Sequence, residues 1–244
     1  MRKIGTVQQI NLYPVKSMRG VSVEKATCYW YGLNGDRKLA FVHQDDTSGF
    51  PWVTAREIPR LLQYQPEFVS PDDPMKSVVV VRTPSGKHLP ADSQELADEL
   101  MSTYEKPVTL VKLSRGTFDC MPVSLLTQTS LDTLQSKLPY ALDARRFRAN
   151  VIIDAEVKNG YPENEWVNGL VSFGDRADSA QLLVNYPDKR CMMVNLDPET
   201  SQSNPDILKK VVKETNSCFS VYASVQKLGT VEVGDSVFLQ HSES

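Results

Sequence analysis

VSVEKATCYWYGLNGDRKLAFVH, residues 21–43, contains two β-strand patterns on either side of a turn. Val21 to Trp30 is rich in Val, Thr, Tyr and Trp, which favour strands, and Leu39 to His43 is a second apolar run. Between them lie Gly32 and Gly35, which supply the positive φ angles that a tight turn requires. Short strands joined by compact turns are typical of β-rich folds such as barrels.

The same pattern extends over the rest of the chain. Further strands are expected at 4–13, 77–82, 151–154 and 180–186, the last ending at Pro187, with a closing hairpin over 229–239. Apolar residues at helical spacing predict three helices, at 93–104, 129–138 and 205–215. Strands and helices do not alternate strictly, which disfavours a doubly wound parallel sheet. We therefore predict a mainly β fold, with two β-barrel-like parts at 1–106 and 107–244 and a few inserted helices.

Composition and charge argue against several classes of function. The 244 residues include 27 Lys and Arg against 30 Asp and Glu, a formal net charge of −3. Such a chain is a poor candidate for non-specific nucleic-acid binding, which depends on neutralising many phosphates. No stretch is apolar enough for a bilayer span or a signal peptide, so we expect a cytoplasmic protein with no membrane partner. Three scattered histidines, and four cysteines without a C-x-x-C pair, disfavour a zinc site.

Four short segments combine cations with turn residues beside expected strands: Tyr13 to Gly20, Gly35 to Arg37, Asp143 to Asn150, and Pro187 to Cys191. In the first, Lys16 and Ser17 place a charge next to a hydroxyl, a pair that often meets an oxyanion. The Asp–Arg pair of the second is expected to be an exposed ion pair unless it has a ligand. The three arginines of the third need anionic partners, which are either a ligand or carboxylates of the chain.

Cys191 differs from the other cysteines because it directly follows Lys189 and Arg190 at a strand end. Positive neighbours favour the thiolate, which is both a nucleophile and a soft metal ligand. The apolar residues 192–194 leave open the alternative of a buried, inert thiol.

Taken together, these segments resemble the MOSC family, with a MOSC N-terminal β-barrel domain at 1–106 and a MOSC domain at 107–244. The resemblance covers nearly the whole chain and includes the amidoxime-reducing and bacterial reductase members of the family. It rests on the order and spacing of Tyr-Pro-Val-Lys-Ser at 13–17, Gly-Asp-Arg at 35–37, Val-Thr-Ala-Arg at 53–56, Arg-Phe-Arg-Ala-Asn at 146–150, Pro-Asp-Lys-Arg-Cys at 187–191, Asp-Pro-Glu-Thr at 197–200 and Gly-Thr-Val-Glu-Val-Gly-Asp at 229–235.

The resemblance implies a molybdenum cofactor (molybdopterin), with Cys191 as the catalytic residue and the metal ligand. It implies six cofactor-binding residues: Lys16, Ser17, Arg37, Arg148, Asn150 and Arg190. Three residues at two places depart from the family pattern. Relatives carry hydroxyl residues where this chain has Cys120-Met121, and a Ser where it has Lys189, so side-chain hydrogen bonds expected at 120–121 are lost.

The implied function is an oxidoreductase that reduces N-hydroxylated small molecules and releases water, with Asp197 as a candidate proton donor. No ferredoxin-type cysteine cluster occurs in the sequence, so electrons are expected from a separate donor such as a ferredoxin or a flavoprotein reductase. The alternative is a sulfur or molybdenum-cofactor carrier that uses Cys191 as a persulfide or thiolate. A third hypothesis is a structural barrel whose site has decayed, of which Cys120-Met121 would be a sign.

Overall fold

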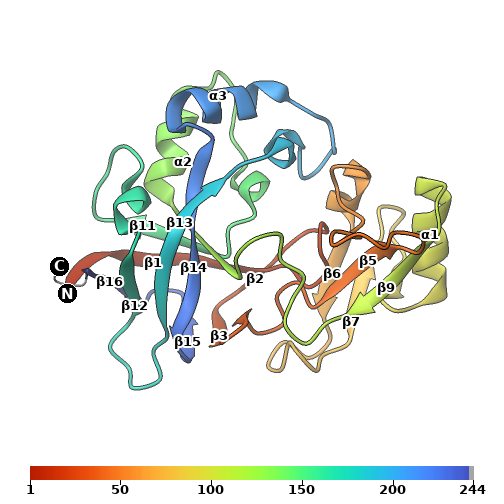
Figure 1. Cartoon of the computed structure of the whole chain (residues 1–244), viewed down its shortest axis with the longest axis horizontal. Coiled ribbons are helices and arrows are strands. Elements are labelled where there is room, and N and C mark those ends of the chain that lie inside the picture. The colour runs from red at the N-terminus through yellow and green to blue at the C-terminus, as the bar shows by residue number, and fades with distance from the viewer. Residues whose placement is uncertain (242–244) are drawn as a thin grey trace.

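Seven strands form a closed β-barrel at the left of Figure 1. The computed structural model describes residues 1–241, and the barrel order within them is β11-β10-β14-β13-β12-β16-β1, closed by pairing of β1 with β11. Only β10 and β11 pair in parallel. The barrel strands are β1 (Arg2–Leu12), β10 (Val123–Thr127), β11 (Val151–Ala155), β12 (Gly169–Phe173), β13 (Gln181–Lys189), β14 (Cys218–Lys227) and β16 (Ser236–His241). An eighth strand, β2 (Val21–Val23), pairs with the end of β1 outside the barrel.

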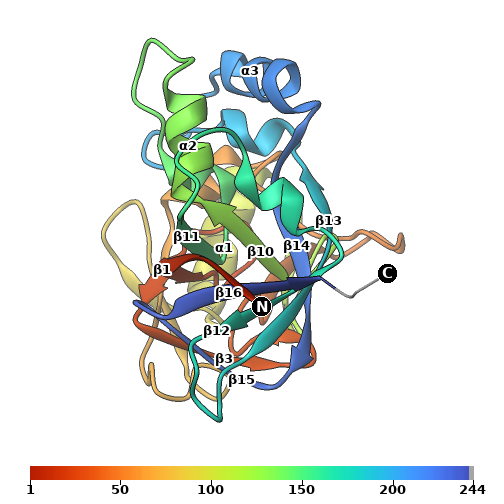
Figure 2. The same cartoon turned by 90° about the vertical axis from the view of Figure 1, so that its left-hand side faces the viewer.

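Side chains of the barrel strands alternate between the barrel interior and an outer layer. In β11, Val151 and Ile153 belong to the interior core, whereas Ile152 belongs to an outer cluster with Leu131 and Val211. Both faces of the strand are therefore buried, which explains why this strand is apolar at consecutive positions. The outer layer is formed by α2 (Gln128–Gln135) and α3 (Pro205–Thr215), which lie above the barrel in Figures 1 and 2.

The second part of the molecule, at the right of Figure 1, is built from small antiparallel sheets and α1 (Gln94–Tyr104) around a core of its own. One sheet pairs β5 (Leu39–His43) with β9 (Val108–Lys112), and another joins β6 (Gln65–Phe68), β7 (Val79–Arg82) and β8 (His88–Pro90). The remaining sheet joins β3 (Lys25–Tyr29), β4 (Gly32–Leu33) and β15 (Gly229–Glu232), and its buried residues Ala26, Cys28, Leu33 and Val231 belong to the barrel core instead. The mainly β prediction is confirmed, while the boundary at 106–107 stays a prediction.

The three predicted helices are present. Each begins after a residue whose side chain accepts a backbone hydrogen bond from the first turn: Ser93, Thr127 and Asn204. The first and third agree with the predicted ranges to within one residue. The second ends at Gln135, three residues earlier than predicted, and Leu138 packs on the outer cluster from the turn that follows.

Two predicted strand features are wrong. The strand expected to stop before Pro187 continues to Lys189, because register shifts around the proline accommodate its missing N–H. The expected hairpin over 229–239 does not form. Instead, β15 pairs with β3, and β16 pairs with β1 and β12. The turn at 233–235 therefore moves the chain from one sheet to another.

No helix within residues 1–241 combines the length and apolar character needed to cross a bilayer. The ends of the described chain lie close together, because Arg2 pairs with Leu239 in the barrel.

Candidate functional site

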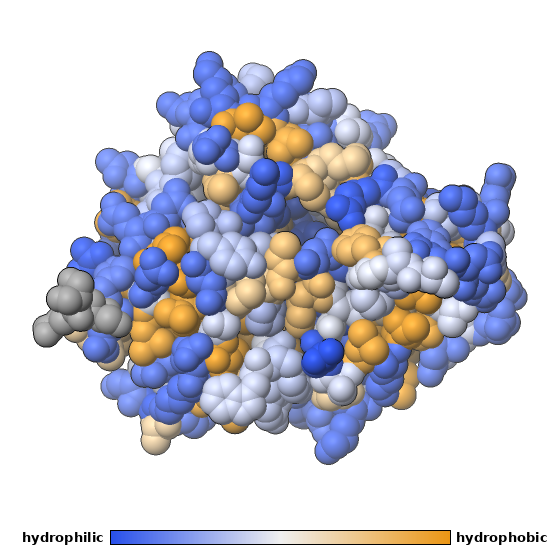
Figure 3. Space-filling model, viewed as in Figure 1, coloured by the Kyte–Doolittle hydropathy of each residue, from blue (hydrophilic) through white to orange (hydrophobic). Residues whose placement is uncertain are grey.

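A cleft of about 330 Å³ lies where the barrel meets the N-terminal sheets, and Figure 3 shows a hollow near the middle of this face. Its walls come from segments that are far apart in sequence: the turn after β1, the turn after β4, the segment before β11 and the end of β13. The cleft is lined by Cys191 and by all six residues expected to bind a cofactor, Lys16, Ser17, Arg37, Arg148, Asn150 and Arg190. The structure thus brings these residues together, and their roles stay a prediction.

The turn after β1 presents Lys16 and Ser17, which are both buried. Lys16 Nζ donates to the carbonyl of Thr117 at 2.7 Å and forms an ion pair with Asp119. Burial lowers the pKa of Lys16, although Asp119 opposes the shift. Ser17 has φ +66°, and within the described chain its hydroxyl makes no hydrogen bond. The turn therefore offers the cleft a desolvated charge and a free hydroxyl.

Tyr13 supports two of the arginines. Its ring centroid lies 4.7 Å from the guanidinium carbon of Arg37 and 4.2 Å from that of Arg148. Asp36 accepts from the Tyr13 backbone N–H at 2.7 Å, from Asn150 Nδ2 at 3.2 Å, and from Arg37. Asp36 is buried, so the expectation of an exposed ion pair is wrong.

Asn150 joins three segments of the cleft wall. Its side-chain amide donates to Asp36 and to the carbonyl of Asn11, and it accepts from the backbone N–H of Ser124 at 3.2 Å. Because both Nδ2 and Oδ1 of Asn150 already have partners in the chain, the side chain links these segments and stabilises the cleft wall.

The three neighbouring arginines have different partners. Arg145 pairs with Asp143 and Glu199, and Arg146 pairs with Asp197 at 2.7 Å, so both have carboxylate partners in the chain, although Arg146 Nε is left without a partner within residues 1–241. Arg148 donates through Nη1 to the carbonyl of Met18 at 2.7 Å. Its Nη2 is buried and has no hydrogen-bond partner within residues 1–241. Of the three, only Arg148 lines the cleft.

Burial lowers the pKa of Arg148 to about 10, and the nearby Arg37 adds to that effect, yet the side chain remains a cation at neutral pH. A buried, unfilled N–H donor on a cation is costly unless an acceptor meets it. This feature fits a bound group that carries oxyanions.

Cys191 follows β13 and precedes the 3₁₀ helix η4 (Met192–Asn195). Its side chain is exposed, so the alternative of a buried, inert thiol is wrong. The neighbouring Arg190 turns to an ion pair with the buried Asp188 and to the carbonyl of Phe147 at 2.5 Å. Burial raises the pKa of Asp188, although Arg190 opposes that shift.

The remaining cysteines differ in accessibility. Cys120 is exposed and lines the same cleft, Cys218 is half-buried, and Cys28 is buried in the barrel core. No group of three or more His, Cys, Asp or Glu side chains suited to a metal ion occurs within residues 1–241. A metal here would therefore need ligands from a bound cofactor in addition to a thiolate.

Several lining residues were not anticipated. Thr54 and Arg56 belong to the quoted 53–56 motif, which had been given no role, whereas Phe118 and Tyr222 had no local signal. The suggested proton donor Asp197 is not among the lining residues. Burial raises its pKa, but hydrogen bonds from the backbone of Thr200 and Glu199, together with Arg146, lower it overall. The lowered pKa favours its carboxylate form, which does not suit a proton donor, and the role itself stays a prediction.

Charge is strongly segregated toward this cleft. The cationic lining residues are Lys16, Arg37, Arg56, Arg148, Lys189 and Arg190, and the lining carboxylates are Asp119 and Asp188. The whole chain has a net charge of −3, so this local excess of positive charge creates an anion-attracting site.

The fold and the site define a β-barrel protein with an anion-attracting cleft around an exposed cysteine. The family model described as MOSC domain matches residues 112–238, and the one described as MOSC N-terminal beta barrel domain matches residues 4–123. The chain belongs to the MOSC family.

Curated relatives match nearly the whole chain, and one solved structure shares its fold. The chain is 24% identical to mitochondrial amidoxime reducing component 2 of Bos taurus, over 98% of this chain and 84% of the relative. It is 25% identical to mitochondrial amidoxime-reducing component 1 of Homo sapiens, over the same shares. The YuaD protein from Bacillus subtilis shares the fold, with a TM-score of 0.53 and 13% identity over 100% of this chain and 99% of that one.

Proposed function

We propose that the cleft binds a molybdenum cofactor and that the protein reduces N-hydroxylated small molecules. The observation that carries this proposal is the convergence of an exposed Cys191 with an excess of cations, one of which, Arg148, has a buried donor without a partner. The names of the relatives support the reaction class, because an amidoxime is an N-hydroxylated amidine.

Cys191 is the protein ligand to the metal in this proposal, since a thiolate is a soft ligand and its exposed position allows a bound group to reach it. Arg148 supplies a planar donor to an oxyanion, and Lys16 supplies a point charge. Arg37 and Arg190 add positive charge while paired with buried carboxylates. Asn150 and Ser17 are the two uncharged residues of the proposed cofactor-binding set.

When bound, the cofactor supplies the electrons for N–O cleavage, in which R–NH–OH takes up two electrons and two protons and gives R–NH2 and water. The chain's residues hold the cofactor and set the charge around it. Electrons come from a separate protein, such as a ferredoxin or a flavoprotein reductase, and the expected compartment is the cytoplasm.

The test is reduction of acetamidoxime to acetamidine by protein from a host that makes the cofactor, with dithionite and a dye as artificial donor. We expect turnover by the wild type and loss of turnover in Cys191→Ser. Molybdenum-loaded protein that reduces no N-hydroxylated compound, but transfers sulfur from a Cys191 persulfide, would favour the carrier hypothesis instead.

A further inference from the structure

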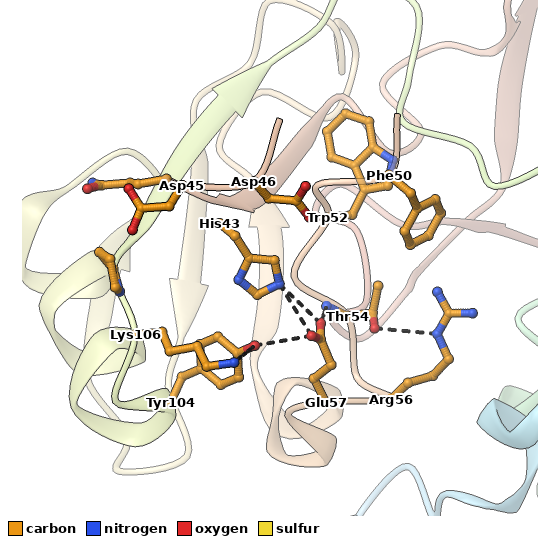
Figure 4. A pocket seen from close by; sticks show the side chains of 12 residues that line it. His43, Asp45, Asp46, Phe50, Trp52, Thr54, Arg56, Glu57, Tyr104 and Lys106 are labelled. Carbon is orange, nitrogen blue, oxygen red and sulfur yellow. Dashed lines mark hydrogen bonds and ion pairs between the residues drawn. The ribbon is translucent and has the colours of Figure 1, made fainter. Parts of the chain in front are cut away.

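A second and larger pocket, of about 670 Å³, lies beside the cleft in the N-terminal part of the molecule (Figure 4). Phe50, Thr54 and Arg56 line both cavities, so the two spaces share a wall. Thr54 and Arg56 are the polar residues of the 53–56 motif, and their position at this boundary gives that motif a physical context.

The boundary is aromatic. Lys16 Nζ, in the cleft, lies 5.8 Å from the ring centroids of both Phe50 and Trp52. The guanidinium carbon of Arg56 lies 5.2 Å from the Phe50 centroid. A molecule that fills the second pocket therefore lies against Phe50 and Trp52 with one end near the cleft. Large, flat faces of this kind favour planar, aromatic ligands.

The far side of the pocket is polar and ordered. Figure 4 shows the Glu57 carboxylate facing both His43 and Tyr104, which lie side by side. The Glu57 carboxylate lies 3.3 Å from His43 Nε2, and it accepts from the Tyr104 hydroxyl at 3.1 Å and from the backbone N–H of Thr54 at 3.2 Å. The His43 and Tyr104 rings are 5.3 Å apart.

This arrangement defines what the pocket offers a ligand. Because a carboxylate only accepts, the hydrogen of a neutral His43 ring lies on Nε2, which leaves Nδ1 as an acceptor. Within the described chain Nδ1 has no hydrogen-bond partner. Asp45 adds a second acceptor at the edge of the pocket. A ligand that carries a hydrogen-bond donor on this side can therefore find an acceptor there.

We propose that this pocket is the specificity subsite for the body of the substrate, and that it takes a planar aromatic group with a hydrogen-bond donor on the side away from the N-hydroxyl. The inference rests on the proposed function for the direction in which the substrate lies. The aromatic ring lies against Phe50 and Trp52, the donor meets His43 Nδ1, and the N-hydroxylated end extends past Arg56 into the cleft.

The experiment measures binding of three probes to the full chain without cofactor, by isothermal titration calorimetry. The probes are acetamidoxime, which has no ring; 4-methylbenzamidoxime, which has a ring but no distal donor; and 4-aminobenzamidoxime, which has both. We expect the ring to tighten binding about tenfold, given an aromatic contact of roughly 0.5–1.5 kcal/mol plus area burial. The amino group should tighten it a further threefold to tenfold, as one net hydrogen bond does.

Variants assign each contribution to a residue. His43→Phe retains an aromatic ring but removes Nδ1. It should abolish only the tighter binding of 4-aminobenzamidoxime relative to 4-methylbenzamidoxime. Glu57→Gln places an amide opposite Nε2 of His43. Because an amide can donate to Nε2, the ring hydrogen can move to Nδ1, and the affinity difference between the two ring-bearing probes should shrink. Phe50→Ala should weaken both ring-bearing probes. His88→Phe, at an exposed histidine in β8, is the matched control and should change nothing.

Equal affinity for all three probes, or an amino-probe advantage that survives His43→Phe, would overturn the subsite even if the loaded protein reduces acetamidoxime. Probe binding with the expected sensitivity to His43→Phe supports the subsite even if the loaded protein reduces nothing, a result that would count against the proposed function alone.

Discussion

Within the described residues, Arg148 is the one arginine of the 145–148 segment that forms no ion pair with a carboxylate. It follows the 3₁₀ helix η2 (Ala144–Phe147) with φ +52°, and this left-handed residue turns the chain toward the cleft. Charge and spacing could not separate it from Arg145 and Arg146, because all three are cations within four positions, and only the family resemblance singled it out. Their difference depends on a backbone turn and on the remote partners Asp197 and Glu199.

The first prediction concerns the planar donor set of Arg148. Arg148→Lys keeps the charge but loses the buried Nη2 donor, so cofactor retention should fall about tenfold or more, since a hydrogen bond to a charged group contributes roughly 1.5–3 kcal/mol. Molybdenum retained during exhaustive dialysis measures this. Arg145→Lys, whose residue pairs with Asp143 and Glu199, is the control. Equal retention in the two variants would exclude Arg148 from cofactor binding.

The second prediction separates a core thiol from the exposed ones. Burial raises the pKa of Cys28 to about 12, so in native protein Cys28 should resist iodoacetamide while Cys191 and Cys120 react.

Cys28→Ser should lower the free energy of unfolding by about 1–3 kcal/mol, because it buries a hydroxyl among apolar residues. Cys191→Ser should change it by less than about 0.5 kcal/mol. Denaturant unfolding and peptide mass mapping check both, and rapid labelling of Cys28 would refute this account.

At the scale of elements, a buried carboxylate ties α2 to the 3₁₀ helix η3 (Pro162–Trp166). Glu163 is buried and accepts from the hydroxyls of Thr127 at 2.7 Å and Ser130 at 2.6 Å. Burial raises its pKa above the ordinary value of 4.5, although the two hydroxyls oppose the shift. The folded protein therefore keeps a proton on Glu163 at pH values where the unfolded chain has lost it.

The third prediction follows from this linkage. Wild-type stability relative to Glu163→Gln should fall as pH rises from about 4.5 through the raised pKa, and stay constant above it. Denaturant unfolding from pH 4 to 8 measures the difference, with Glu165→Gln, at an exposed position of the same helix, as control. A difference that grows with pH would contradict the raised pKa.

The elements differ in how far sequence could predict them. Helices are set by contacts within one segment, so the periodicity of apolar residues located α1 and α3 to within one residue. A strand needs a partner, and the partners of β15 and β16 come from β3, β1 and β12. The hairpin prediction failed for that reason. The pocket around His43 was missed in the same way, because Glu57 and Tyr104 meet it only after α1 packs beside β5 and β9.

At the scale of the whole molecule, barrel closure depends on close contact between β1 and β11. Gly5 pairs with Ala155 at this seam, and a Cβ at position 5 would lie 2.4 Å from the carbonyl oxygen of Asp154. Closure also places the end of β1, with Lys16 and Ser17 after it, beside the segment that carries Arg148. The seam therefore supports the cleft as well as the fold.

The fourth prediction tests the seam. Gly5→Ala should destabilise the protein by about 1–3 kcal/mol, because the backbone of β11 must move to admit a methyl group. Thermal and denaturant unfolding measure the loss. Gly49→Ala is the control, since a Cβ there meets no atom within 4 Å. Unchanged stability of Gly5→Ala would mean that the strands are farther apart than described.

Molybdenum content per chain tests the cofactor assignment most directly. Wild type, Cys191→Ser and Cys120→Ser are purified by gel filtration from a host that makes the cofactor, and the metal is measured by mass spectrometry alongside a melting curve. We predict equimolar molybdenum in wild type, little change in Cys120→Ser, and a large loss in Cys191→Ser with the melting transition intact. Wild-type protein without molybdenum, or Cys191→Ser protein that retains the full amount, would contradict the account.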